Sequence, residues 1–202
     1  MQGMFWQELP RALALPGGPC PIQTDFRAYV RLTETLLKEQ ATREERLLAC
    51  FSLFKEEPAD GEAALTALLD FYRQGSEGAE GTTRRAAEEG GRPRGSGRPV
   101  LSYTVDGWYI VGAFWEHYGI DLLRIPYLHW WEFCGLLAAL PGDCTLKQRM
   151  YYRSLRPGDI ADKAERRRIR RIQRALALPG QPVTDGEIGA VLWKEGETDG
   201  GR

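Results

Sequence analysis

The chain has 202 residues, a formal net charge of −1 at pH 7, 43% hydrophobic residues and 10% aromatic residues. This length and composition favour a folded protein with one good core and exclude a largely disordered chain. No apolar run approaches the ~20 residues that a membrane-spanning helix needs. The first residues lack the basic start and apolar core of a signal peptide, so we expect a cytoplasmic protein without a membrane partner.

The charges are distributed unevenly along the chain. Residues 1–80 carry 8 basic and 13 acidic side chains, whereas residues 147–174 carry 11 basic and 3 acidic ones. This separation predicts a molecule with a negative end and a positive end, which can orient a partner or copies of the protein against each other. The four cysteines, Cys20, Cys50, Cys134 and Cys144, form no CxxC pair, so structural thiols are favoured over zinc or a disulfide framework.

The N-terminal segment, residues 1–23, predicts a small hairpin or loop. Residues 11–15 and 19–23 flank Pro16-Gly17-Gly18, a combination that is typical of a turn. The motif Arg-Ala-Leu-Ala-Leu-Pro-Gly recurs at residues 174–180 in a different context, and we interpret this as a coincidence of biased composition.

Residues 24–74 are predicted to form three short amphipathic helices that pack as a small bundle. Thr24 or Asp25 can cap the first, which runs to about Lys38; the second covers about residues 42–54; Asp60 can cap the third, which ends at about Arg73. Three- and four-residue spacing gives each helix one inward face. The inward positions are Phe26, Val30, Thr33, Leu37, Leu47, Phe51, Phe54, Leu65, Leu68, Leu69 and Tyr72.

Residues 75–99 differ from the rest of the chain. They hold seven glycines, two prolines and five arginines, and they contain no large apolar residue. Such a composition cannot bury enough surface to offset the entropy of ordering, which predicts a flexible linker or an extended loop. The arginines resemble an RNA-binding tail, but a solvated insertion is the favoured interpretation.

Residues 106–133 contain four of the six tryptophans and both histidines, and they indicate two aromatic helices joined by a short break. The first helix places Trp108, Val111, Phe114, Trp115 and Tyr118 on one face and ends at Gly119, which suits a left-handed C-terminal cap. Pro126 suits the first turn of the second helix. That helix carries Leu128, Trp131, Leu136, Leu137 and Leu140 before it stops at Pro141-Gly142. So much aromatic surface is either the core of the domain or the socket for a partner.

Trp130 and Trp131 are adjacent, so on a helix they point about 100° apart and cannot both face one core. We expect Trp131 to pack inside with Leu128, and Trp130 to share a second face with Phe133 and Leu137. This pattern favours a central helix enclosed by others, while an exposed interaction patch containing Trp130 and Phe133 stays open.

Residues 100–178 are expected to share one core with residues 24–74. Thr145 can cap a helix to about Leu155, and Asp159 can cap a long helix to about Leu176. Residues 179–202 are rich in glycine and glutamate, which predicts a frayed tail with a possible short helix at residues 187–193. The fold class is therefore mostly α, a compact domain of about seven helices with a small N-terminal β-hairpin and a flexible insert.

The central motifs resemble a known family. Tyr-Gly-Ile-Asp-Leu at 118–122 followed by Leu-His-Trp-Trp-Glu-Phe at 128–133 is similar to the bacteriophage gp-fifteen family. Weaker similarities extend the resemblance over roughly residues 9–176, apart from the insert. They are Ile-Gln-Thr-Asp-Phe-Arg at 22–27, Leu-Leu-Asp-Phe-Tyr at 68–72, and Arg-Ser-Leu-Arg at 153–156 with Asp159-Ile160.

The resemblance implies a small helical protein from the tail-morphogenesis region of phages and prophages of Gram-positive bacteria. It implies phage tail proteins as partners, with a tail-assembly chaperone near the tape-measure protein as the expected role, in the host cytoplasm or, for a structural component, in the virion tail. No residue roles follow from it, because no catalytic motif is associated with the family.

The residues that could carry chemistry form no complete catalytic pattern. His129 and Glu132 stand at helical i, i+3 spacing, and Asp121 and Cys134 are near in sequence, but no oxyanion donor, metal or phosphate loop accompanies them. A zinc site with His117 lacks ligand spacing, and no GxxxxGK[ST] motif supports nucleotide binding. We expect a non-enzymatic protein without cofactor or metal, in which His129 is hydrogen-bonded in a wall of the core.

The arginine-rich helix near residue 170 is the second functional signal. A solvated face, a surface that steers an acidic or amphipathic helical partner, and a nucleic-acid surface are all compatible with it. The sequence pI of about 6.2 and the lack of a base-stacking aromatic within the helix make nucleic acid the least favoured. The candidate partner-binding residues are Trp130, Phe133, Arg166, Arg167, Arg170, Arg171 and Arg174.

Overall fold

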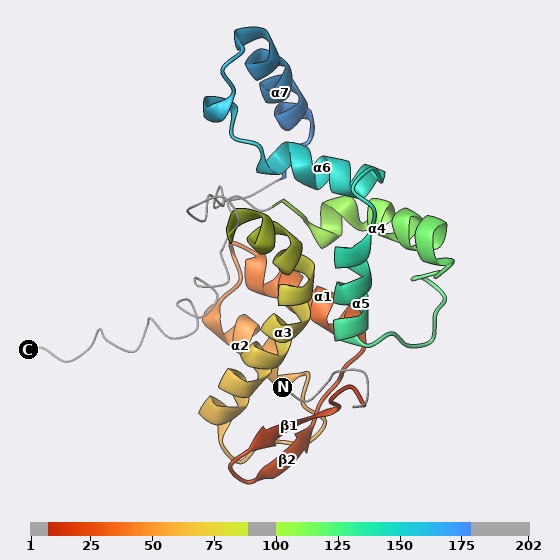
Figure 1. The fold of residues 1–202 in the computed structure, drawn as a ribbon. Helices are drawn as coiled ribbons and strands as arrows, with labels where there is room; N and C mark the ends of the chain where they lie inside the picture. Colours follow the sequence, from red (N-terminus) through yellow and green to blue (C-terminus); the bar gives the residue numbers. More distant parts are fainter. Residues whose placement is uncertain (1–7, 89–99, 179–202) are drawn as a thin grey trace, which may run out of the picture.

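The computed structural model describes residues 8–88 and 100–178, and for residues 75–88 it describes the backbone only (Figure 1). Within these ranges the chain forms two strands and seven α-helices, which confirms the mostly α fold class. The helices are α1 Phe26–Leu37, α2 Arg43–Phe51, α3 Gly61–Glu88, α4 Tyr103–Tyr118, α5 Trp130–Ala139, α6 Thr145–Ser154 and α7 Lys163–Ala175, with a short 3-10 helix, η2 Pro157–Asp159, before α7. No described helix combines the length and the apolar character needed to cross a bilayer.

The N-terminal hairpin is present. Strands β1 (Ala12–Leu15) and β2 (Gly18–Pro21) pair antiparallel, and Leu15 lies opposite Gly18 at the turn. Gly18 has a φ of +113°, a conformation that L-residues with a side chain rarely adopt, so glycine is required here. Leu13 and Cys20 are buried, and β1 packs against the first part of α3.

Local capping chemistry explains where α1, α2 and α3 begin. Asp25 accepts a hydrogen bond from the backbone of Arg27 at the start of α1. Thr42 and Glu45 form a reciprocal capping box on α2, and Asp60 accepts from two backbone N–H groups of α3. All four inward positions predicted for the third helix are buried. In α1 the buried face is instead centred on Phe26, Tyr29, Leu32, Thr33 and Leu36.

The third helix is longer than its composition indicates. α3 runs to Glu88, so the backbone of residues 75–88 is helical where the glycines predict a linker or loop. Glycine lowers helix stability by about 1 kcal/mol per residue without forbidding the conformation, and a helix that is already formed can extend at little cost. The remainder of the predicted insert, residues 89–99, lies outside the described residues, as do residues 1–7 and the tail at 179–202.

Helix α5 lies in the middle of the fold, between α1, α3 and α4 (Figure 1). Its first residue, Trp130, is fully buried; the indole stacks on Tyr29 and Tyr72 and donates from Nε1 to the backbone oxygen of Tyr72 at 3.2 Å. Phe133 stacks between Phe26 and Phe114. The central-helix interpretation of α5 is therefore confirmed.

The connection between α4 and α5 differs from the prediction. Gly119 does end α4 in the left-handed conformation, with a φ of +66°. Pro126, however, lies outside α5, which begins at Trp130 with His129 as its N-cap. Arg27 holds this connection against α1, because its guanidinium donates to the backbone oxygens of Leu122 and Ile125 at 2.9 and 2.7 Å.

Helices α6 and α7 extend from the α4 side of the molecule, and α7 forms the end farthest from the β-hairpin (Figure 1). α4, α5 and α6 contribute to the same core cluster as α1 to α3, whereas no residue of α7 belongs to it. Asp159 is not the cap of the last helix, since it ends η2. Asp162 caps α7, which begins at Lys163.

Candidate partner-binding surfaces

Helix α4 exposes an aromatic stripe, defined by Val105, Trp108, Gly112 and Trp115. These residues recur at three-, four- and three-residue spacing, which places them along one face. Trp108 is 79% exposed and Trp115 is 61% exposed. Large exposed tryptophans in line on one helix are unusual for a solvated surface and are typical of an interaction site.

The residues predicted to share one face of α4 divide between core and surface: Phe114 is buried, whereas Trp108 and Trp115 are exposed. The structure buries Asp106, Ile110, Ala113 and Phe114 in place of Trp108 and Trp115. α4 is apolar on most sides, so periodicity alone does not decide which side faces the core. A charged residue, Asp106, lies on the buried side and determines the rotation of the helix.

Asp106 is buried because α6 supplies two cations to it. Arg153 makes a two-pronged contact, with Nη1 2.5 Å from Oδ2 and Nη2 3.0 Å from Oδ1, and Arg149 Nε lies 3.2 Å from Oδ1. Burial alone would raise the pKa of Asp106, but the hydrogen bonds from Arg153, the Ser102 backbone and Arg149 outweigh it, so the pKa lies below its ordinary value. The carboxylate stays charged and fixes α4 to α6.

Arg153 links further segments through the same guanidinium. Its Nε donates to the backbone oxygen of Leu176 at 2.8 Å, and its Nη1 donates to that of Val100 at 2.9 Å. One buried side chain therefore joins α4, α6, the segment before α4 and the end of α7.

Trp130 and Phe133, two of the predicted partner-binding residues, are in the core and expose no surface to a partner. Their aromatic neighbours explain why both side chains are buried. Phe26 and Tyr29 of α1, Tyr72 of α3 and Phe114 of α4 close around α5. Trp131, predicted to be inside, is half-buried at the edge of this cluster and donates from Nε1 to the Phe71 backbone oxygen at 2.9 Å.

His129 and Glu132 form a capping box rather than an acid–base pair. Nδ1 of His129 accepts from the Trp131 N–H at 3.1 Å, and Glu132 accepts from the His129 N–H at 3.1 Å. Nε2 lies 3.1 Å from the Pro10 backbone oxygen, which fixes the tautomer with the proton on Nε2. Asp121 binds the Leu123 backbone and Arg124 instead, and burial raises the pKa of the Cys134 thiol.

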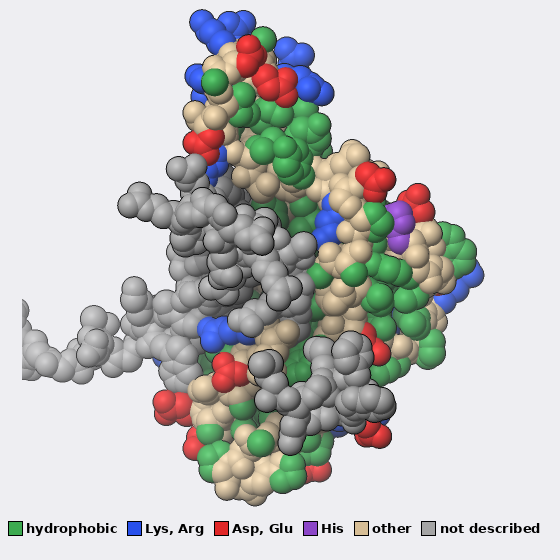
Figure 2. All heavy atoms as spheres, in the orientation of Figure 1, with side chains coloured by type: hydrophobic (Ala, Val, Ile, Leu, Met, Phe, Trp, Pro, Cys, Tyr) green, Lys and Arg blue, Asp and Glu red, His purple; other side chains and the backbone are tan. Residues whose placement is uncertain are grey.

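The predicted binding residues of α7 separate into two groups. Arg166 turns back to the chain and donates from Nε and Nη2 to the Ile160 backbone oxygen at 3.0 and 2.7 Å. Arg167, Arg170, Arg171 and Arg174 are exposed. Side chains of lysine and arginine gather around α7 at this end of the molecule (Figure 2).

Four of these cations form what we call the cationic face: Lys163, Arg167, Arg170 and Arg174. They follow four-, three- and four-residue spacing, and Ile169 points to the opposite, buried side. The acids of α7 lie elsewhere, since Asp162 caps the helix and Glu165 pairs with Arg168. Among the described residues, no ion pair joins the cationic face to a carboxylate.

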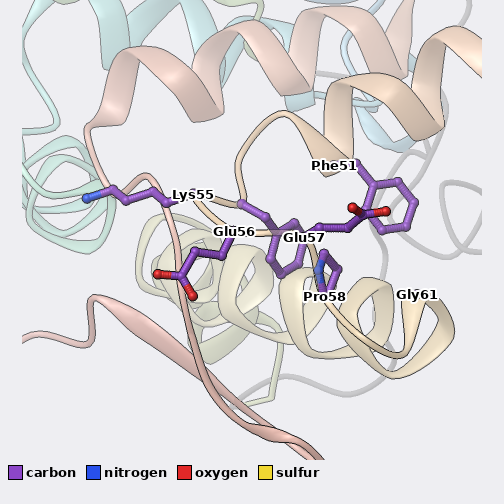
Figure 3. Close-up of a pocket in the computed structure, with 7 residues that line it drawn as sticks. Phe51, Lys55, Glu56, Glu57, Pro58 and Gly61 are labelled. Carbon is purple, nitrogen blue, oxygen red and sulfur yellow. The ribbon is translucent and has the colours of Figure 1, made fainter.

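A hollow of about 470 Å³ lies at the other end of the molecule, where α2 leads into α3 (Figure 3). We call it the α2–α3 hollow; it is lined by Phe51, Phe54, Lys55, Glu56, Glu57, Pro58 and Gly61. The two phenylalanine rings lie 6.0 Å apart between centroids. In Figure 3 Lys55 points away from Phe51, whereas the carboxylate of Glu57 lies on the same side as that ring.

The sequence left open whether Trp108 and Trp115 belong to the core or to a partner socket, and it did not predict the hollow. The only signal for the stripe is its regular spacing, and the opposite face of α4 carries equally regular apolar residues. Among the residues that the structure describes, no group of three or more histidines, cysteines or acids is placed to hold a metal ion.

Comparison with known proteins gives one finding. The family model described as "Bacteriophage Gp15 protein" matches residues 5–178, and neither the curated proteins nor the solved structures gave a match. The matched range covers every described helix, the aromatic stripe and the cationic face. The chain therefore belongs to the bacteriophage Gp15 protein family.

Proposed function

We propose that this protein is a phage tail-assembly factor that binds helical segments of the tape-measure protein, in the manner of a chaperone, until the tail tube assembles around them. On this proposal it acts in the host cytoplasm and performs no catalysis. The phage family supports the context, and the exposed aromatic stripe of α4 is the observation that carries the binding role.

The stripe suits an amphipathic helix as its partner. A helix presents apolar side chains at three- and four-residue spacing, and the stripe offers the same spacing over more than two turns. Gly112 leaves a gap in the stripe between the two indoles, because nothing lies within 4 Å of the position where its side chain would begin. A long structural protein rich in helices would supply many such segments.

Co-expression with a tape-measure fragment tests the role. We expect wild-type protein to raise the soluble yield of the fragment and to co-purify with it. The double variant Trp108→Ala/Trp115→Ala should lose most of this effect, since truncating two hot-spot tryptophans lowers affinity by about 2 kcal/mol or more, roughly thirtyfold. The thermal midpoint of the variant should stay close to wild type, because exposed side chains contribute little to folding.

Leu48→Ala is the matched control, because Leu48 is 70% exposed and lies on α2, away from the stripe. It should leave the solubilising effect intact. If the tryptophan variant solubilises the fragment as well as wild type does, the stripe is not the binding surface. If wild type neither solubilises nor co-purifies with the fragment, the proposed function itself is wrong.

A structural tail component is the alternative within the same context. A chaperone should be absent from purified virions, whereas a connector or completion protein should be present in them. Mass spectrometry of purified virions separates the two.

A second candidate function, nucleic-acid binding, is favoured by the cationic face alone. That face has no aromatic side chain for stacking, and the one neighbouring amide side chain, Gln173, donates to the Tyr152 and Leu155 backbone oxygens. A filter-binding titration against salt tests it: a steep fall of affinity with salt would support phosphate contacts, and a slope near zero removes the candidate.

A further inference from the structure

We propose that the cationic face of α7 in one copy docks into the α2–α3 hollow of a second copy, so that the protein associates head to tail. The cationic face is Lys163, Arg167, Arg170 and Arg174, and the hollow is the site lined by Phe51, Phe54, Lys55, Glu56, Glu57, Pro58 and Gly61. This inference does not depend on the proposed function, because it uses neither the aromatic stripe nor the tape-measure protein.

The two surfaces are complementary in charge. Residues 55–62 at the hollow contain four acids, Glu56, Glu57, Asp60 and Glu62, and one base, Lys55, which points away from Phe51 (Figure 3). Asp60 caps α3, while no ion pair within the described residues compensates the other three acids. An uncompensated acidic surface and an uncompensated cationic one on the same chain are the charge pattern of two interacting ends.

The hollow also suits arginine in particular. A guanidinium group is planar and weakly hydrated, so it stacks on aromatic rings and pairs with carboxylates at the same time. Phe51 and Phe54 provide two tilted rings, and Glu57 carries its carboxylate on the side of the Phe51 ring (Figure 3). Three of the four residues of the cationic face are arginines.

The two surfaces lie at opposite ends of the molecule, so they cannot meet within one chain. α7 forms one end, and the first turns of α3 lie at the other, beside the β-hairpin (Figure 1). Contacts between unlike surfaces of identical chains generate a ring when the rotation closes and an open row when it does not. We therefore assign a second copy of the chain to the α2–α3 hollow, because it carries the cationic face that matches the hollow.

The experiment measures mass against concentration by sedimentation, using the full chain at low and high salt. We expect wild type to gain mass as concentration rises at low salt and to return to one chain at high salt. Two double variants test the two surfaces separately: Arg167→Glu/Arg170→Glu and Glu56→Lys/Glu57→Lys. Each removes one surface, so each should stay monomeric at concentrations at least about tenfold above the midpoint of wild-type association.

The decisive sample is an equal mixture of these two variants. Each retains the surface that the other lacks, so the mixture should form a species of two chains and nothing larger. Arg31→Glu/Arg124→Glu is the control, because it makes the same change in net charge on exposed arginines of α1 and of the α4–α5 connection. It should associate as wild type does.

Three results would overturn the proposal. The first is a wild-type protein that stays one chain at every concentration at low salt. The second is two variants that still associate alone, which would place the interface elsewhere. The third is a mixture that stays monomeric while Arg167→Glu/Arg170→Glu abolishes salt-dependent DNA binding of the wild type, which would assign the cationic face to nucleic acid.

Discussion

Asp106 is a charged residue whose burial depends on partners from a distant part of the sequence. Arg149 and Arg153 follow it by 43 and 47 positions, and together they replace the water that the carboxylate loses on folding. Breaking such a pair leaves uncompensated buried charge, which costs more than the pair itself contributes.

Asp106→Asn should therefore lower the free energy of unfolding by about 3–5 kcal/mol, measured by urea denaturation at neutral pH. Asp121→Asn is the matched control, since the pair of Asp121 with Arg124 is at the surface, and it should cost about 1 kcal/mol or less. A loss at Asp106 no larger than at Asp121 would contradict a structural role for the buried cluster.

The stabilisation by Asp106 also depends on pH. Because the folded-state pKa of Asp106 is lowered, its contribution to the free energy of unfolding is present above the ordinary aspartate pKa. That contribution is lost as pH falls through the folded-state value.

His129 predicts a second pH dependence, because its pKa is also lowered, here by a site that disfavours the charged imidazolium. Burial lowers its pKa below the ordinary value of 6.5, against raising contributions from Pro10 and Glu132. The unfolded chain then binds the proton more readily than the folded one, so stability is constant above about pH 6.5 and falls as pH drops below it. Protonated Nδ1 can no longer accept the Trp131 N–H, which removes one of the two hydrogen bonds of the α5 capping box.

The variant His129→Asn keeps a capping acceptor but cannot take up a proton. We expect its urea-unfolding free energy to be lower than wild type at pH 7 and to change less between about pH 5 and pH 7. The quantity to compare is the slope against pH rather than the stability at one pH. An unchanged slope would show that another group titrates in this range.

At the scale of the elements, Gly112 within α4 and Gly119 at its C-cap have opposite requirements. Gly119 ends the helix with a φ of +66°, whereas Gly112 lies in the exposed helical interior with no atom within 4 Å of its missing Cβ. Gly119→Ala should destabilise by about 1 kcal/mol, since a Cβ is strained in the left-handed region, and Gly112→Ala should stabilise by about 0.5–1 kcal/mol. Thermal unfolding of the two variants checks the sign, and equal shifts in one direction would contradict the assignment of Gly119 as the cap.

Besides the mostly α fold class and the hairpin, several helix caps could be predicted from sequence, although the cap predicted at Asp159 was wrong. Asp25, Asp60 and Gly119 act within a few residues of themselves, so their roles are encoded locally. The rotation of α4 could not be predicted, because nearly every side of it is apolar and the decision depends on Arg149 and Arg153. The cationic character of α7 was predicted from its high arginine content, but the exposure of Trp108 and Trp115 and the burial of Trp130 depend on tertiary packing.

At the scale of the whole molecule, the helices differ in how they are held. α5 lies inside the core, whereas α7 packs on α6 and η2 and buries only Ile169. Helices with few buried apolar contacts open locally without global unfolding. The molecule thus has a rigid body of α1 to α5 and a more weakly held end that carries the cationic face.

Hydrogen exchange should reveal this difference. Backbone amides of α7 are expected to exchange through local opening, at least about tenfold faster than those of α5. Ile169→Ala should accelerate exchange in α7 further and leave α5 unchanged, because it removes the one buried side chain of α7. Equal protection of the two helices in wild type would mean that α7 unfolds only together with the core.

The guanidinium of Arg153 has a mechanical consequence. Its four hydrogen bonds, to Asp106 twice, to Val100 and to Leu176, leave from one flat and stiff group. A pull on the end of α7 that displaces Leu176 must therefore rotate that group against Asp106 or break the bond. Load applied at one extremity of the protein is in this way transmitted to the helix that displays Trp108 and Trp115.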